Sequence, residues 1–196
     1  AAEMGKYMAA VVIGLFFHAL LVYFPLLRFV AKVPLLKFLR AIAPAQLLAF
    51  SSSSSGATLP VTMECVERGL GVDEEATSFV LPLGATINMD GTGLYQGVAA
   101  VFIATMYNID LSVGQQLQIV LVAALASIGT AAVPGVGIVM LTIVLTQIGV
   151  PPEGMLLICA VERPLDMCRA VLNVTGDATV CTVVAASEGL MGGEAA

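Results

Sequence analysis

The stretch Leu81 to Gly97, LPLGATINMDGTGLYQG, decides how the chain is organised, because it places polar residues inside a long apolar run. The run extends from Phe79 to Met106, and Asp90 lies near its centre. A carboxylate at the centre of a bilayer-length helix costs roughly 2.5–3.5 kcal/mol on insertion scales. Gly91, directly after it, weakens the helix at the same point. The stretch therefore predicts a broken transmembrane helix whose backbone lines a cavity or an ion site.

The composition of the whole chain agrees with a membrane environment. Of its 196 residues, 59% are hydrophobic and only 11% are charged, whereas a soluble domain carries about 25% charged residues. Continuous apolar runs of bilayer length favour an all-α helix bundle over a β-barrel. There is no basic patch of the kind that binds nucleic acid, so the lipid bilayer is the expected partner and nucleic acid is not.

The apolar runs predict five membrane segments within one domain over residues 1–196. The first and last are spanning helices, and the third is the broken helix. The second and fourth each consist of two apolar arms that are too short to cross alone, separated by small or polar residues, so we expect re-entrant hairpins. The five segments are 8–33, 41–65, 76–106, 115–150 and 154–187.

The basic residues predict the orientation of these segments. Four of the eight Lys and Arg residues lie in the expected loop from Arg28 to Arg40, which the positive-inside rule places in the cytoplasm. The two hairpins then enter from opposite sides. A weak internal repeat, SSGATLP at Ser54–Pro60 and SIGTAAVP at Ser127–Pro134, marks their tips. Oppositely oriented repeats with broken segments that meet at mid-membrane are typical of secondary transporters.

The last segment carries a polar stripe. At about 100° per residue, five of its polar residues fall within roughly 80° of one helix face, and such a face does not point into lipid. Asp166 can accept from an ammonium group, and Arg169 offers a planar fork to a carboxylate. The alternative is a network satisfied within itself, in which Arg169 pairs with Asp166 and Glu162. The stripe consists of Glu162, Asp166, Arg169, Asn173 and Asp177.

The break around Asp90 supplies a carboxylate, an amide and freed backbone carbonyls, which suit a hard cation such as sodium. The alternative is a packing kink with a hydrogen-bonded Asp90. The only histidine, His18, is either a proton carrier or a helix-packing residue. The hairpin tips offer backbone N–H groups at half-helix starts, which suit a carboxylate. Pro134 and Gly135 would let the outer tip hinge as a gate.

Four stretches closely resemble the glutamate transporter family, whose members are sodium-coupled dicarboxylate and amino-acid symporters that include archaeal aspartate transporters. The resemblance runs from about Met4 to Glu188 and implies the C-terminal part of the family's mobile transport domain. It also implies a multi-pass protein of the plasma membrane and a homotrimer, held by preceding helices that this chain does not contain. The stretches are SSGATLPVTMECVE, FVLPLGATINMDGTGLYQGVAAVFIA, GTAAVPGVGIVMLTIVL and LDMCRAVLNVTGDAT.

The resemblance implies a site for each ligand. Asp166 would take the substrate's amino group, Arg169 its side-chain carboxylate and Asn173 its main-chain carboxylate. The implied substrate residues are Ser54, Ser55, Thr92, Val133, Gly137, Asp166, Arg169, Ala170 and Asn173. One sodium site would use Gly84, Asn88, Asn173 and Asp177. A second would use Thr86, Ser127, Ile128 and Thr130, with Met89 nearby, and a third would use Asn88 and Asp90.

The sequence departs from the family at several of these positions. Ala170 stands where the family usually has Thr, which removes one substrate hydrogen bond. Glu162 replaces a usual Asp, and Ala132 replaces a usual Gly at the outer tip. Many members carry an extra arginine at one of two positions that here hold Ser53 and Met167.

We therefore expect sodium-coupled symport of aspartate or glutamate by an elevator-type motion, with the substrate held between the hairpin tips and the last helix. The alternatives are a neutral amino-acid or C4-dicarboxylate carrier of the same family, or a truncated or engineered core that binds or folds but does not transport. An enzyme is not expected, because the serines at 51–55 have no histidine base near them.

Overall fold

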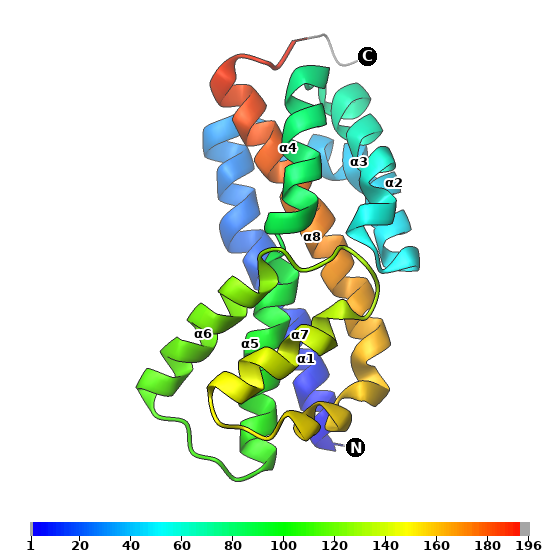
Figure 1. The fold of residues 1–196 in the computed structure, drawn as a ribbon. Coiled ribbons are helices and arrows are strands. Elements are labelled where there is room, and N and C mark those ends of the chain that lie inside the picture. The colour runs from blue at the N-terminus through cyan, green and yellow to red at the C-terminus, as the bar shows by residue number, and fades with distance from the viewer. Residues whose placement is uncertain (1, 193–196) are drawn as a thin grey trace.

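The computed structural model describes residues 2–192, and its regular elements are helices (Figure 1). Within these residues the only strand-like feature is one isolated bridge between Val72 and Met191. The α-helices are α1 (Ala2–His18), α2 (Leu35–Ser52), α3 (Ser55–Leu70), α4 (Glu74–Ile87), α5 (Asp90–Met106), α6 (Val113–Ser127), α7 (Val136–Gln147) and α8 (Cys159–Glu188).

The first helix is longer than the predicted segment 8–33 at its N-terminal end. It begins at Ala2 and continues beyond α1 through two π-helical stretches, η1 (Ala19–Tyr23) and η2 (Leu26–Ala31). Pro25 lies between them, and its missing N–H group explains why the regular hydrogen-bond pattern shifts there. Lys32 ends the helix in a left-handed conformation with φ 58°. The expected loop from Arg28 to Arg40 is therefore mostly helical.

Helices α2 and α3 form the first helical hairpin, and its tip explains the serine cluster. Ser53 adopts a left-handed conformation at the end of α2. Ser54 then caps α3, because its hydroxyl accepts a hydrogen bond of 3.0 Å from the Ala57 N–H group. Serine is a favoured residue at such an N-cap.

Helices α4 and α5 together form the broken helix, and the break is shorter than the glycines suggested. Only Asn88 and Met89 lie outside the helices, whereas Gly91 and Thr92 belong to the first turn of α5. Asp90 is the first residue of α5, where the partial positive charge of a helix N-terminus favours a carboxylate.

Helices α6 and α7 form the second helical hairpin. Ser112 and Gln115 make a capping box at the start of α6. The tip between the helices contains Gly129 and Gly135, which adopt positive φ angles of 76° and 77°. A short 3₁₀ helix, η3 (Pro152–Leu157), leads from this hairpin into α8.

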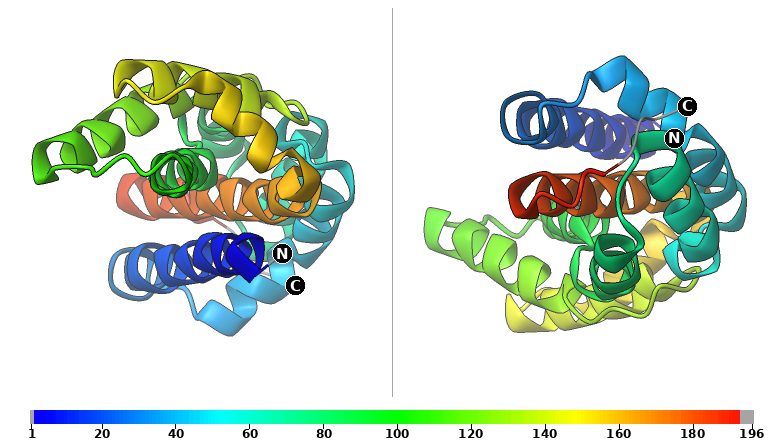
Figure 2. Two further views of the ribbon diagram at one scale, coloured as in Figure 1. Left: turned by 90° about the horizontal axis from the view of Figure 1, so that it is seen from below. Right: turned by 90° about the horizontal axis from the view of Figure 1, so that it is seen from above.

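The two hairpins lie in opposite halves of the molecule, and their tips face each other near its middle (Figure 1). Helix α8 runs between the other helices in both end-on views (Figure 2). One core cluster packs α1, α5, α6 and α7 against the first half of α8, and a second packs η2, α2, α3 and α4 against its second half. The polar middle of α8 therefore lies where the two cores meet.

Many large apolar side chains point outward, in agreement with a lipid environment. Phe16, Phe29 and Leu117 are 63%, 74% and 67% exposed. The helices Ala2–Ala31 and Cys159–Glu188 are each long and apolar enough to cross a membrane. Helices α6 and α7 are apolar but shorter, as expected for arms that do not span alone.

Candidate functional site

The tip of the α6–α7 hairpin is fastened to three other elements. Its Gly129 N–H group donates to the Thr86 carbonyl of α4 at 2.8 Å, and its Gly135 N–H group donates to Asp166 Oδ2 of α8 at 2.9 Å. The Ala132 carbonyl accepts from Ser54 Oγ at 2.6 Å and from Gly56 N at 3.3 Å. The two hairpin tips, the break between α4 and α5, and the middle of α8 thus meet at one place.

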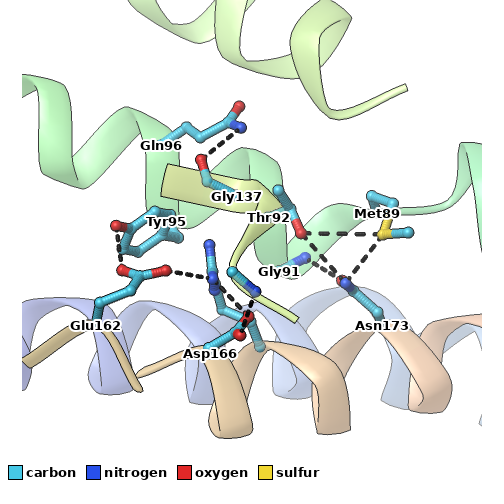
Figure 3. A network of polar contacts seen from close by, with 11 residues as sticks. Met89, Gly91, Thr92, Tyr95, Gln96, Gly137, Glu162, Asp166 and Asn173 are labelled. Atoms are coloured by element: carbon cyan, nitrogen blue, oxygen red, sulfur yellow. Dashed lines mark hydrogen bonds and ion pairs between the residues drawn. The ribbon is translucent and has the colours of Figure 1, made fainter. Parts of the chain in front are cut away.

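Arg169 is the most deeply buried charge of this place, with 2% of its surface exposed. Its Nη2 donates to Glu162 Oε1 at 2.7 Å and to Asp166 Oδ1 at 2.6 Å. The Tyr95 ring lies 4.0 Å from the guanidinium carbon, a cation–π contact, and the Tyr95 hydroxyl donates to Glu162 (Figure 3). The alternative predicted for the polar stripe, in which Arg169 pairs with Asp166 and Glu162, therefore forms, but only through the Nη2 atom of Arg169.

The other two nitrogens of the Arg169 guanidinium have no partner. Both Nε and Nη1 are buried without a hydrogen bond within the described part of the chain. Buried donors are nearly always satisfied in folded proteins, so such a group points to a ligand. Because both unpartnered groups are donors on a cation, a negatively charged acceptor such as a carboxylate is the fitting ligand.

Gly137 of α7 makes room for this guanidinium. A Cβ atom built at Gly137 would overlap Arg169 Nη1, so the close approach of the α6–α7 hairpin to Arg169 requires glycine. The Gly137 carbonyl faces Gln96 Nε2 at 3.5 Å (Figure 3).

Asn173 ties α8 to the start of α5. Its Oδ1 accepts from the Gly91 N–H group at 2.8 Å, and its Nδ2 lies 3.2 Å from Met89 Sδ and 3.3 Å from Thr92 Oγ1 (Figure 3). A Cβ atom at Gly91 would meet Asn173 Oδ1 at 2.9 Å. Gly91 thus serves close packing against α8 and does not widen the break.

The two hairpin tips, the start of α5 and the middle of α8 line a cavity of about 20 Å³, which is room for about one water molecule. The cavity is lined by every predicted substrate residue except Ser54, whose hydroxyl instead bonds to Ala57 and Ala132. Sequence reasoning gave no substrate role to several further lining residues. These are Ser53, Met89, Thr130, Ala131, Ala132 and Val136.

The first predicted sodium site comes together around Asp177. Its Oδ1 accepts from Asn88 Nδ2 at 3.1 Å and lies 2.8 Å from where a Gly84 Cβ would be. Asp177 is 4% exposed, and no Lys, Arg or His side chain in the described range forms an ion pair with it. A buried carboxylate without a counter-charge is costly, so these oxygen groups fit a bound cation. The fourth predicted ligand, Asn173, uses its Oδ1 on Gly91.

The residues of the second predicted sodium site also adjoin one another. The Thr86 carbonyl accepts from Gly129, and the Ser127 carbonyl accepts from Thr130 N at 3.2 Å. Ile128 and Thr130 belong to the tip of the α6–α7 hairpin, as does Gly129. Across residues 2–192 no group of three or more His, Cys, Asp or Glu side chains is placed to hold a metal ion, so ions here would depend on carbonyl and amide oxygens.

Asp90, which with Asn88 makes up the third predicted sodium site, does not line the small cavity. Its Oδ2 accepts from the Tyr23 hydroxyl at 2.8 Å and lies 3.1 Å from His18 Nε2. This is the hydrogen-bonded Asp90 of the packing alternative, and it gives His18 a specific partner. His18 and Asp90 also line a larger, mainly apolar pocket of about 770 Å³ between α1, α5 and α6.

Comparison with known proteins agrees with this geometry. The model of the sodium:dicarboxylate symporter family matches residues 1–187. Excitatory amino acid transporter 3 of Mus musculus is 51% identical over 178 residues, which are 90% of this chain and 34% of that protein. An excitatory amino acid transporter of Caenorhabditis elegans is 47% identical over 183 residues, 92% of this chain and 36% of that protein. The chain thus spans about a third of the length of these relatives.

The matching family is one of symporters and these relatives are named as transporters, which agrees with the expected multi-pass membrane protein and not with an enzyme. Because the family match covers nearly the whole chain, the chain belongs to the sodium:dicarboxylate symporter family.

Proposed function

We propose that this chain is the substrate- and ion-binding part of a sodium-coupled symporter for acidic amino acids, with aspartate or glutamate as substrate. The observation that carries the proposal is Arg169, whose Nε and Nη1 are buried and have no hydrogen-bond partner among the described residues, beside a small cavity. A neutral substrate would leave these donors unsatisfied, at the cost of a buried polar group without a hydrogen bond.

The polar groups around the cavity match the three charges of an acidic amino acid. Arg169 binds the side-chain carboxylate through a free nitrogen of its guanidinium. The Asn173 amide and the N-terminus of α3 at Ser55 receive the main-chain carboxylate, and Asp166 receives the ammonium group. Thr92, Val133, Gly137 and Ala170 complete the walls, in agreement with their places around the cavity.

Sodium binds next to this site and is linked to it through shared elements. Asp177, Asn88 and Gly84 form one site, the outer tip with Thr86 and Met89 forms a second, and Asp90 contributes to a third. The uncompensated burial of Asp177 supports the first. The bond between Gly129 and Thr86 supports the second, because it couples the ion ligands to the tip that covers the substrate.

Transport follows from movement of the outer tip and then of the whole unit. The cavity is too small for an amino acid, so the α6–α7 tip must open before substrate enters. In this proposal the two hairpins are oppositely oriented re-entrant hairpins of an inverted repeat, which their facing tips support (Figure 1). The unit then moves across the membrane as an elevator, within a homotrimer held by segments outside this chain.

The test is calorimetric titration of the purified protein with L-aspartate, with sodium or potassium as the only cation. We expect binding in sodium, little in potassium, and loss of aspartate binding in an Arg169→Ala variant. Unchanged aspartate affinity in that variant would refute the acidic assignment. Sodium-gradient-driven uptake into vesicles would then separate a transporter from a core that only binds.

One observation favours a second candidate, a C4-dicarboxylate carrier. Both carboxylate oxygens of Asp166 are already engaged, Oδ1 by Arg169 and Oδ2 by Gly135, and Ala170 offers no hydroxyl. Asp166 keeps lone pairs for an ammonium group, but Arg169 already compensates its charge, so a substrate without an amino group leaves no carboxylate on α8 without a partner. Succinate is the matching ligand, because it has two carboxylates and no amino group, and it belongs in the same titration series.

A further inference from the structure

Tyr23 makes a buried polar contact that the proposed function does not use. It is the last residue of η1, is 3% exposed, and its hydroxyl donates to Asp90 Oδ2 at 2.8 Å. Asp90 is one of the two carboxylates proposed to bind sodium, and the other, Asp177, belongs to α8. The Tyr23 hydroxyl thus reaches from the first helix into the region of the proposed ion sites.

The π-helical form of η1 brings Tyr23 to this place. At about 100° per residue, His18 and Tyr23 would point about 140° apart on a regular α-helix. The i→i+5 hydrogen bonds of a π-helix instead bring residues five apart to one face. The His18 and Tyr23 ring centroids accordingly lie 5.0 Å apart, and both side chains contact Asp90 Oδ2. Because π-helical turns are rare and frequent at functional sites, the irregular backbone supports a functional role for this shared contact.

The two contacts leave the other carboxylate oxygen of Asp90 available. Tyr23 and His18 both meet Oδ2, whereas Oδ1 accepts no hydrogen bond from residues 2–192. A hard cation such as sodium prefers oxygen ligands, and hydrogen bonds from neighbouring groups fix the orientation of a carboxylate that binds a metal ion. The hydroxyl of Tyr23 is therefore placed to orient Asp90 for an ion.

Gly176 of α8 shows how near Tyr23 comes to the Asp177 site. A Cβ atom at Gly176 would overlap the Tyr23 hydroxyl and would lie 2.9 Å from Asn88 Nδ2, so this approach requires glycine. The same Asn88 nitrogen donates to Asp177 Oδ1 at 3.1 Å. The Tyr23 hydroxyl and the Asn88 amide are therefore neighbours across Gly176, and together they lie between the two carboxylates.

We propose that Tyr23 is a positioning residue for sodium, whose hydroxyl holds Asp90 so that its free oxygen faces the ion that Asn88 also binds. Without this hydroxyl the Asp90 carboxylate can turn, so sodium binds more weakly while the substrate groups on α8 keep their places. This inference rests on the proposed function and deepens it, because it adds a residue of the first helix to the ion sites.

The test uses Tyr23→Phe in the full-length protein, since phenylalanine keeps the ring and removes only the hydroxyl. Dissociation constants for L-aspartate are measured by calorimetry at limiting and at saturating sodium. One hydrogen bond to a charged group predicts about tenfold weaker aspartate binding at limiting sodium, and binding close to that of the unsubstituted protein at saturating sodium. Without aspartate, the sodium concentration that gives half of the sodium-dependent rise in melting temperature should increase by a similar factor.

The matched control is Tyr7→Phe. Tyr7 is another buried tyrosine of α1, with 2% of its surface exposed, but its hydroxyl has no hydrogen-bond partner among the described residues. Its replacement should leave the sodium requirement unchanged. The same shift in both variants would overturn the inference, as would an unchanged sodium requirement in Tyr23→Phe. Aspartate binding that is weakened equally at both sodium concentrations would show a general structural effect and overturn it too.

A substitution on α8 tests the same contact from the other side. Gly176→Ala would displace the Tyr23 hydroxyl with its methyl group and should also raise the sodium requirement. In the double variant with Tyr23→Phe the displaced atom is absent, so the two effects should be less than additive, and full additivity would contradict the inference. If the unsubstituted protein shows no sodium-dependent binding of aspartate, the proposed function itself fails, so the two failures are distinguishable.

Discussion

At the scale of single residues, Gly137 gives a sharp test of the site, because its missing side chain is what admits the Arg169 guanidinium. Gly137→Ala would push the guanidinium off its place while leaving the helices intact. We expect aspartate affinity to fall at least tenfold, an effect of about 1.4 kcal/mol. Calorimetry on the folded variant measures it.

The control for this substitution is Gly97→Ala in α5, where a Cβ atom would meet nothing within 4 Å. Alanine in a helix interior is favoured over glycine by about 0.5–1 kcal/mol, so this variant should be slightly more stable and bind aspartate normally. If the two variants lose affinity equally, the close approach of Gly137 to Arg169 does not matter for binding.

Glu162 gives a second prediction at this scale, because it holds Arg169 Nη2 together with Asp166. Glu162→Gln keeps the side chain's size and removes its charge. The neutral amide attracts the Arg169 guanidinium less than the carboxylate does. We therefore expect aspartate binding that is unchanged or tighter. The same change should lower stability by about 1–3 kcal/mol, because a buried arginine loses an ionic partner. Weaker aspartate binding with unchanged stability would contradict this.

At the scale of elements, Ser54 joins the two hairpins through one hydroxyl that both caps α3 and donates to the Ala132 carbonyl. Ser54→Asp keeps an acceptor for the cap but cannot donate, whereas Ser54→Asn has both an acceptor and a donor. We expect faster hydrogen exchange at the Gly129 and Gly135 amides in the Asp variant, together with aspartate release that is about tenfold faster. Similar exchange in the two variants would mean that this bond does not hold the outer tip closed.

The elements also show what can be predicted from the sequence. Apolar arms around small or polar tips predicted two hairpins, and the helix pairs α2–α3 and α6–α7 lie there, while their re-entry into a membrane stays a prediction. The period of α8 predicted one shared face for five polar residues, and these are buried. The break was placed too broadly, because Gly91 packs closely against Asn173 within a helix. Tyr95 escaped notice since its contacts with Glu162 join residues 67 positions apart, and no local pattern reports such a distance.

At the scale of the whole molecule, the two larger hydrophobic cores are joined mainly through α8, and the ligand groups lie at their junction. Asp177 belongs to the half of α8 that packs with the α2–α3 hairpin. Gly84 lies in α4 and Asn88 directly follows it, and the tip of the α6–α7 hairpin bonds to α4 at Thr86. An ion bound there would therefore connect both halves. It would stabilise the folded protein by an amount that grows with the ratio of ion concentration to dissociation constant.

This linkage predicts a sodium-dependent melting temperature. At a sodium concentration 100 times the dissociation constant, the gain is about 2.7 kcal/mol for one site, which should raise the melting temperature by several degrees relative to potassium. Asp177→Asn removes the buried charge, so it should be as stable as the unsubstituted protein in potassium, or more so, and should gain little from sodium. Asp110→Asn, in the loop between α5 and α6 and without an ion pair among the described residues, should respond to sodium normally. An equal sodium response in both variants would show that Asp177 does not bind the coupling ion.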